Sequence, residues 1–355
     1  MRLVRFWFPA VALVVPIAVL VLLSQSFAPL TVQRVVTEAL IRIVAVVGLY
    51  IFVGNSGIVS FGHVTFMAIA AYAAAWQTCC QMLKPITMSG LPAFLRDNTF
   101  PLLPSALTSI AAAGALAFLS GLVLMRLSGL AASISSLALL FIVNVVYSNW
   151  ESVTMGTASV VGIPTYVTAP VALVCAILAI VVAYLYQVSS RGLTLRATRD
   201  DEVAAAASGI SLYWSRLFAF TLSGFVMGLA GVLHAHYLGT ISINAYFLNL
   251  TFLTLAMLVV GGQRSLAGAV VGVVVLSAII DIFRRLEAGV SVGTAQLALP
   301  AGTQELILAA VMLVILIFRK DGLMGGRELE LPRGKAEPPA RVQSAKNLAG
   351  AAGKT

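Results

Sequence analysis

The sequence predicts an all-α polytopic membrane protein with about ten transmembrane helices and with both termini in the cytoplasm. Hydrophobic residues make up 60% of the 355 residues, charged residues only 10%, and the mean hydropathy is +1.01. Soluble domains carry roughly 25% charged residues, so this composition excludes an ordinary soluble fold. Apolar runs recur at about the 20-residue length that a helix needs to cross a bilayer. Most Lys and Arg side chains flank those runs, as residues that set topology do.

Ten apolar runs define the expected spans. They lie at 6–28, 35–53, 64–82, 102–124, 130–148, 168–188, 216–238, 249–262, 266–283 and 303–318. The first run follows Arg2 and Arg5 and imitates a secretory signal. Its 18 apolar residues, 6–23, exceed the usual 7–15 of such a signal, so we expect an uncleaved first helix. The last three runs are short or interrupted.

The distribution of basic residues orients these spans. An even number of spans puts both termini on one side of the membrane. With that side as the cytoplasm, 16 Lys and Arg residues lie inside and five outside, or eight against five without those after residue 318. Basic residues concentrate in cytoplasmic loops, so the bias supports this topology.

The chain divides into two parts of different composition. Residues 1–325 form the predicted transmembrane domain. Beyond Leu331 the sequence is rich in Pro, Lys, Arg, Ala and Gly and has almost no large apolar residue. Such a segment buries too little surface to offset the entropy of ordering it, so we expect a disordered basic cytoplasmic tail at 326–355.

Several function classes are excluded by what the sequence lacks. The net charge of +9 does not indicate nucleic-acid binding, because no basic patch is interleaved with aromatic residues. The three cysteines have neither the number nor the spacing for a zinc site or a disulfide framework. Gly353-Lys354-Thr355 is no phosphate loop, because Leu348 stands where the leading glycine is needed. We therefore expect no catalytic residue, no metal site and no cofactor in this chain.

The acidic residues argue against an ion-coupled carrier. All 13 lie in loops, in the tail or near the end of a span. Glu38 is the deepest, and it stands four residues after Arg34 and four before Arg42, so the three can pair on one helical face. Ion-coupled carriers usually need a carboxylate facing the bundle interior, so the energy for any transport is expected to come from elsewhere.

A glycine-rich break, residues 54–63, separates the second and third runs. Its glycines can form a sharp turn or a discontinuous helix whose polar groups line a pathway. We take as candidate pathway residues Asn55, Ser60 and His63 of the break, with Ser133 and Ser136 of the fifth run. The alternative is an ordinary capped turn, with serines that bond back to the preceding helical turn.

A second glycine break, Gly261-Gly262, separates the eighth and ninth runs. Gly268 and Gly272 follow it and stand four residues apart, hence on one face of a helix. Small residues in this spacing let two membrane helices approach closely, so we expect a packing surface there.

A polar segment, residues 189–216, interrupts the apolar runs. It holds four arginines, three adjacent acids and a run of alanines. Acids near a helix start complement the macrodipole, alanines favour the helix and Gly209 would end it. We take as residues that contact a partner Arg199, Asp200, Asp201, Glu202 and Gly209. From the residues alone, a solvated loop is the alternative.

Several of these motifs, in order along the chain, resemble those of LivM-type permease subunits of branched-chain amino-acid ABC transporters. The first is the run from Gly48 through the break at 54–63 to Ala74. The others are Arg126-Leu127-Ser128-Gly129-Leu130, Asn149-Trp150-Glu151-Ser152-Val153-Thr154, Gly192-Leu193-Thr194-Leu195-Arg196-Ala197-Thr198-Arg199-Asp200-Asp201-Glu202, Ala235-His236-Tyr237-Leu238-Gly239 and Gly261-Gly262. The likeness extends from residue 1 to about residue 325.

The resemblance implies a heteromeric importer in the bacterial inner membrane. This chain would assemble with a sister permease (LivH-like), two cytoplasmic ATPase subunits that bind the ATP, and a periplasmic substrate-binding protein, within membrane lipid. Residues 189–215 would be the cytoplasmic coupling loop that sits in a groove of an ATPase. The chain itself would be no enzyme and would translocate branched-chain amino acids. Urea, amides or other small amino or carboxylic acids are alternative substrates, and an ion-coupled secondary carrier is the alternative mechanism.

Overall fold

The computed structural model describes residues 2–79, 82, 84–287, 290–292, 295–297, 300, 302–319 and 321–326. The helices are α1 (Arg2–Phe27), α2 (Leu30–Ser56), α3 (His63–Thr78), α4 (Lys84–Thr87), α5 (Ala93–Arg96), α6 (Leu102–Leu124), α7 (Gly129–Asn149), α8 (Glu151–Thr154), α9 (Ala169–Val188), α10 (Ser190–Asp200), α11 (Glu202–Ala207), α12 (Leu212–Leu238), the 3-10 helix η1 (Ile243–Tyr246), α13 (Leu248–Gly261), α14 (Leu266–Glu287) and α15 (Thr303–Phe318). Two antiparallel ribbons pair β1 (Val160–Val161) with β2 (Thr240–Ile241) and β3 (Val290–Val292) with β4 (Ala295–Leu297).

The predicted all-α membrane fold is confirmed. Eight helical stretches of the described chain are long and apolar enough to cross a bilayer, and η1 and α13 together make one of them. The other two expected spans, 64–82 and 303–318, correspond to α3 and α15, each of 16 residues. A helix of this length spans about 24 Å, less than the hydrocarbon thickness of about 30 Å.

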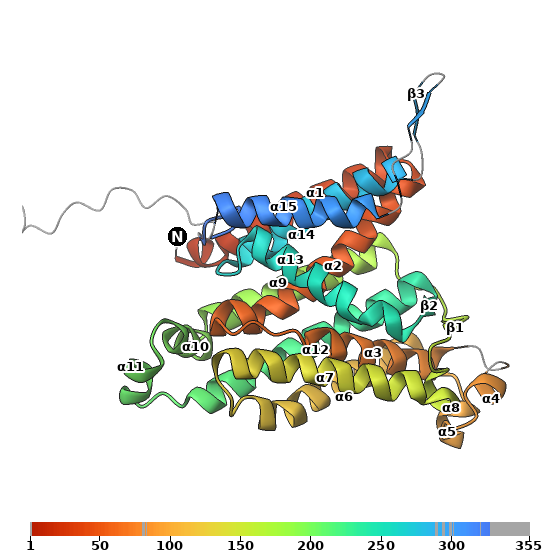
Figure 1. The fold of residues 1–355 in the computed structure, drawn as a ribbon, viewed down its shortest axis with the longest axis horizontal. Coiled ribbons are helices and arrows are strands. Elements are labelled where there is room, and N and C mark those ends of the chain that lie inside the picture. The colour runs from red at the N-terminus through yellow and green to blue at the C-terminus, as the bar shows by residue number, and fades with distance from the viewer. Residues whose placement is uncertain are drawn as a thin grey trace, which may run out of the picture.

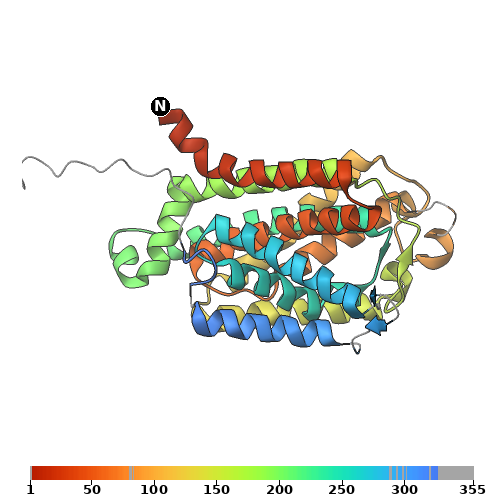
Figure 2. The same cartoon turned by 90° about the horizontal axis from the view of Figure 1, so that it is seen from above.

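The long helices run alternately between two ends of the molecule. At one end lie α10, α11 and the last turn of α2, and at the other lie the β1–β2 ribbon, α4 and α5 (Figure 1). We call these the α10–α11 end and the β1–β2 end. Helix α1 begins and α15 finishes at the α10–α11 end (Figure 2). The chain therefore crosses between the ends an even number of times, as expected. The face of the membrane to which each end belongs remains a prediction.

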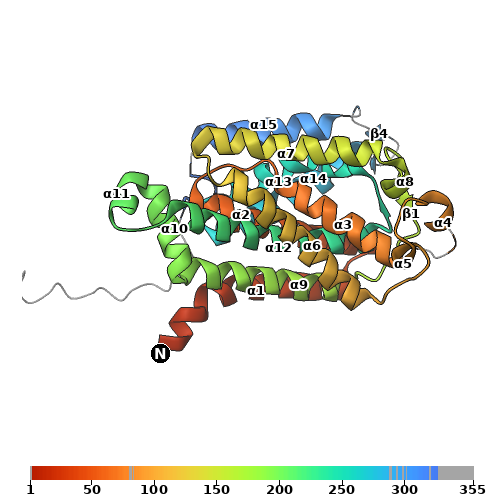
Figure 3. The same ribbon diagram turned by 90° about the horizontal axis from the view of Figure 1, so that it is seen from below.

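Helix α12 lies at the centre of the bundle and packs against α2, α3 and α6. Its small residues allow this: a Cβ on Gly231 would lie 2.1 Å from the carbonyl oxygen of Met67 on α3. The hydroxyl of Ser223 donates a hydrogen bond of 2.6 Å to the carbonyl oxygen of Gly48 on α2. Helices α1, α7 and α15 lie at the edges of the bundle (Figure 3), where their apolar outer faces suit contact with lipid or another subunit.

Close packing at the second glycine break joins α13 to α14. A Cβ on Gly272 would lie 2.0 Å from the carbonyl oxygen of Met257, and one on Gly261 would lie 1.9 Å from that of Gly268. The predicted packing surface of Gly268 and Gly272 is thus confirmed, with Gly261 as its partner. Residues 321–326 pack against the end of α13, where the amide of Leu323 donates to the carbonyl oxygen of Val260 at 2.9 Å. The predicted tail lies outside the described residues except for its first residue, Gly326.

Candidate functional site

The first glycine break turns the chain back into the bundle. Helix α2 ends at Ser56, and Gly57 caps it in the left-handed conformation, with φ of 73°, donating its amide to Val53. Residues 57–62 follow without helix or strand, and α3 begins at His63. The ring of His63 lies 5.4 Å from that of Phe52, so α3 starts level with the last turns of α2. This irregular segment makes the first part of the third crossing, which explains why α3 is short.

Helix α7 supplies the polar groups that the irregular segment needs. The amide of Phe61 donates to the hydroxyl of Ser136 at 3.1 Å, and that hydroxyl donates to the carbonyl oxygen of Ser133 at 2.7 Å. A Cβ on Gly62 would lie only 2.4 Å from the carbonyl oxygen of Ser136, so the two backbones touch. Non-helical backbone at membrane depth must be satisfied inside the protein, and here α7 satisfies it.

The five candidate pathway residues lie around this break and are all buried within the chain. The ring nitrogen Nδ1 of His63 lies 2.7 Å from the hydroxyl of Ser60, and the amide of Asn55 donates to the carbonyl oxygen of Ile51 at 3.0 Å. The Oδ1 atom of Asn55 and the Nε2 atom of His63 are buried and have no hydrogen-bond partner among the described residues. The hydrogen bonds of Ser60 and Ser136 lie within the break and between the break and α7, so they have a structural role. A role of the five residues in translocation stays a prediction.

The coupling segment, residues 189–215, folds into two short helices where the sequence suggested one. The hydroxyl of Ser189 caps α10 by accepting from the amide of Gly192 at 3.2 Å. Asp201 is extended and caps α11, because its carboxylate accepts from the amides of Val203 and Ala204, each at 2.9 Å. A carboxylate at this position also complements the helix dipole. Gly209 lies just beyond α11 with φ of 82°, as expected for the residue that ends it.

The glycine break and the coupling segment meet at the α10–α11 end. The guanidinium of Arg199 on α10 donates a hydrogen bond of 2.7 Å to the carbonyl oxygen of Gly54, in the last turn of α2. The left-handed Gly57 makes room for it, since a Cβ there would lie 2.6 Å from the Cγ atom of Arg199. No local sequence pattern connects the two motifs, because 145 residues separate Arg199 from Gly54.

An ion pair also fixes the coupling segment to the bundle. The carboxylate of Glu202, the first residue of α11, binds the guanidinium of Arg216 on α12, which is buried. Arg196 donates to the carbonyl oxygen of Gln187 at the end of α9. In contrast, the Asp200 side chain is 73% exposed and Val203 is 80% exposed. One side of the coupling segment is therefore bound to the bundle, and the other side is exposed.

Two hollows lie on either side of Glu202. One, of about 310 Å³, is bordered by Gly54, Gly57, Gly129, Arg199 and Arg264. The other, of about 810 Å³, lies between Arg126 of the α6–α7 turn and Trp214 near the start of α12. The coupling segment, both glycine breaks and the α6–α7 turn thus share one uneven surface, of the kind that a partner's projecting side chains can enter.

Comparisons with known proteins match most of the chain. The family described as branched-chain amino acid transport system, permease component, matches residues 31–316, which include both breaks and the coupling segment. The high-affinity branched-chain amino acid transport system permease proteins LivM of Salmonella typhimurium and Escherichia coli are each 25% identical to the chain over 339 residues. That alignment covers 85% of this chain and 72% of each relative. No solved structure matches the chain.

Proposed function

The chain belongs to the permease components of branched-chain amino acid transport systems, and from this premise we propose that it is a subunit of an ATP-driven ABC importer. It is a multi-pass protein of the inner membrane with the helical spans that such a subunit needs. Its cargo would be branched-chain amino acids delivered by a periplasmic binding protein. ATP would be bound and hydrolysed by two cytoplasmic partner subunits, and the pathway would form between this chain and a LivH-like sister permease.

The hydrogen bond from Arg199 to Gly54 carries this proposal. A partner that pushes on the exposed face of α11 displaces α10, and Arg199 passes that displacement to the end of α2 and the adjoining break. The caps at Ser189 and Asp201 and the Glu202–Arg216 ion pair stiffen the segment. A stiff, anchored segment can transmit the movement of the closing ATPases to the membrane helices. A flexible solvated loop would deform and would not transmit that movement.

The position of the coupling segment indicates where the other subunits would bind. If the ATPases dock at the α10–α11 end, the β1–β2 end faces the periplasm and would receive the binding protein. The alternation of the helices between the two ends is consistent with this topology (Figure 1).

Reconstitution tests the proposal. We expect proteoliposomes that contain this chain, its sister permease, both ATPases and the loaded binding protein to accumulate radiolabelled leucine only when ATP is supplied on the ATPase side. An ionophore that collapses proton and sodium gradients should leave uptake unchanged. Uptake that follows an ion gradient without ATP would contradict the importer mechanism, and uptake of urea or an amide in place of leucine would contradict the substrate class.

A further inference from the structure

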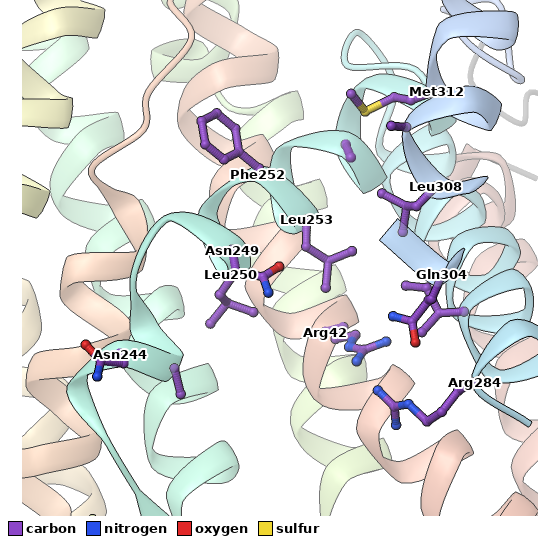
Figure 4. A pocket seen from close by; sticks show the side chains of 14 residues that line it. Arg42, Asn244, Asn249, Leu250, Phe252, Leu253, Arg284, Gln304, Leu308 and Met312 are labelled. Atoms are coloured by element: carbon purple, nitrogen blue, oxygen red, sulfur yellow. The ribbon is translucent and has the colours of Figure 1, made fainter. Parts of the chain in front are cut away.

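A cavity of about 450 Å³ opens between α2, α13, α14 and α15 (Figure 4). Its size is within the range of about 300–1,000 Å³ that small-molecule sites usually have. It lies away from the coupling segment and shares no lining residue with the hollows beside Glu202. It is built entirely within this chain.

One wall of the cavity carries two arginines. Arg42 of α2 and Arg284 of α14 both point into the region where the helices diverge (Figure 4). Glu38 stands between them: its carboxylate binds the guanidinium of Arg42 and lies 3.8 Å from that of Arg284. The spacing in the sequence predicts that Glu38 can pair with Arg34 and Arg42. The Glu38–Arg42 pair is confirmed. The other arginine beside Glu38 is Arg284, since no ion pair of Glu38 with Arg34 occurs among the described residues.

These three side chains hold an excess positive charge. Two guanidiniums face one carboxylate, so the cluster is one negative charge short of neutrality. Arg42 is 14% exposed and Arg284 is 54% exposed, so the first is largely withdrawn from water while the second opens to the cavity. A guanidinium presents five N–H donors in a fork that matches a carboxylate, and few of these are used by Glu38.

The opposite wall is apolar. Leu253 of α13 faces Leu308 and Met312 of α15 across the cavity, and the amide of Gln304 lies between Leu308 and Arg284 (Figure 4). A carboxylate-binding end beside an aliphatic wall is complementary to a small amino acid with an apolar side chain.

The two arginines lie at different depths in the bundle. Arg42 stands 12 residues before Gly54 on one continuous helix, about 18 Å from the contact with the coupling segment. Arg284 stands 18 residues after Leu266, about 27 Å along α14. Arg42 is therefore near the middle of α2, whereas Arg284 lies in the last turn of α14, near the β1–β2 end. A largely buried ionisable residue within a membrane span, as Arg42 is, is expensive and generally marks a substrate or ion pathway.

We propose that this cavity is a substrate site, in which Arg42 and Arg284 hold the carboxylate of an apolar amino acid and the leucines and methionine hold its side chain. The inference rests on the proposed function and deepens it by assigning to this chain a binding site for the cargo on the pathway that it shares with the sister permease. The site lies toward the β1–β2 end, where a binding protein would release its ligand. Coupling through Arg199 would then change a site about 18 Å away along α2.

Photo-crosslinking tests this site directly. The assembled transporter with its binding protein is supplied with photo-leucine, the diazirine analogue of leucine, and adducts are mapped by mass spectrometry. We expect adducts on α13 and α15 around Leu253 and Leu308. Arg284→Gln should reduce them about tenfold or more, the usual effect of losing a charged hydrogen bond. Arg285→Gln is the matched control, because Arg285 pairs with Asp281 at 2.8 Å and does not line the cavity.

A second pair of variants leaves the charges intact. Leu308→Trp fills the cavity from α15, and we expect it to abolish both labelling and leucine uptake. Leu306→Trp adds the same bulk on the outer side of α15, where Leu306 is 73% exposed, and should do neither.

The outcomes separate the two proposals. If the wild-type complex does not import leucine, the proposed function fails. If it imports leucine but photo-leucine labels other helices, or labels Arg284→Gln as strongly as Arg285→Gln, the cavity is not the site. Lipid that co-purifies with the wild type and is lost in Arg284→Gln, without any photo-leucine adduct, would assign the arginines to a lipid phosphate and overturn the proposal.

Discussion

Replacing Arg199 with Ala is expected to lower ATP-driven leucine uptake at least tenfold while the ATPases remain bound and continue to hydrolyse ATP. The substitution removes the hydrogen bond to Gly54 that joins the coupling segment to the glycine break. A hydrogen bond from a charged group contributes about 1.5–3 kcal/mol, and its loss at this junction lets α10 move without α2. Uptake and ATP hydrolysis measured on the same proteoliposomes would show the uncoupling.

Arg191→Ala is the matched control for this experiment. It removes the same charge from the same helix, but Arg191 lies 4.2 Å over the ring of Phe218 and does not contact the break. We expect its uptake to stay within about twofold of the wild type, because exposed cation–π contacts contribute only about 0.5–1 kcal/mol. Equal losses in the two variants would mean that positive charge, rather than the contact with Gly54, is what matters.

Gly272→Val is expected to prevent accumulation of a folded complex, and Gly272→Ala to lower its melting temperature. The added Cβ would lie 2.0 Å from the carbonyl oxygen of Met257 and 2.8 Å from the backbone of Gly261. Overpacking costs typically about 1–3 kcal/mol, and we expect at least the upper end because backbone cannot rotate aside. Fluorescence-detected size-exclusion chromatography and thermal unfolding in detergent measure both effects.

Ala278→Val on the exposed side of α14 is the comparison for this pair. It adds bulk to the same helix without facing α13, so the melting temperature should not change. A Gly272→Ala protein as stable as the wild type would show that α13 and α14 are not in contact at this point.

Much of the fold is encoded locally and could be predicted from the sequence. Apolar runs of span length mark the membrane helices, because the bilayer requires both apolar side chains and internally paired backbone. The break after Ser56, the start of α11 at Glu202 and the stop near Gly209 follow from glycine and capping chemistry over a few residues. The close packing of Gly268 and Gly272 followed from their spacing on one helical face.

The parts that could not be predicted depend on contacts between distant segments. No local pattern indicates that Arg199 meets Gly54, or that Arg284 replaces Arg34 beside Glu38. The division of the coupling segment into α10 and α11 depends on the extended conformation of Asp201, which both the helix dipole and the packing of α10 against α2 favour. Apolar faces that meet lipid look the same in the sequence as faces that meet protein, so the bundle centre at α12 was not apparent either.

Crosslinking from α11 tests directly whether the coupling segment docks an ATPase on the cytoplasmic side. Val203→Cys is the suitable substitution, because the Val203 side chain is 80% exposed and the Asp201 cap beside it stays intact. Thr157→Cys, at an exposed position near β1, reports on the opposite end. We expect the Val203→Cys protein to crosslink to an ATPase subunit in an ATP-dependent manner, and the Thr157→Cys protein to be labelled by an impermeant reagent from the periplasm. Periplasmic labelling of the Val203→Cys protein, with no crosslink to an ATPase, would contradict both the topology and the importer mechanism.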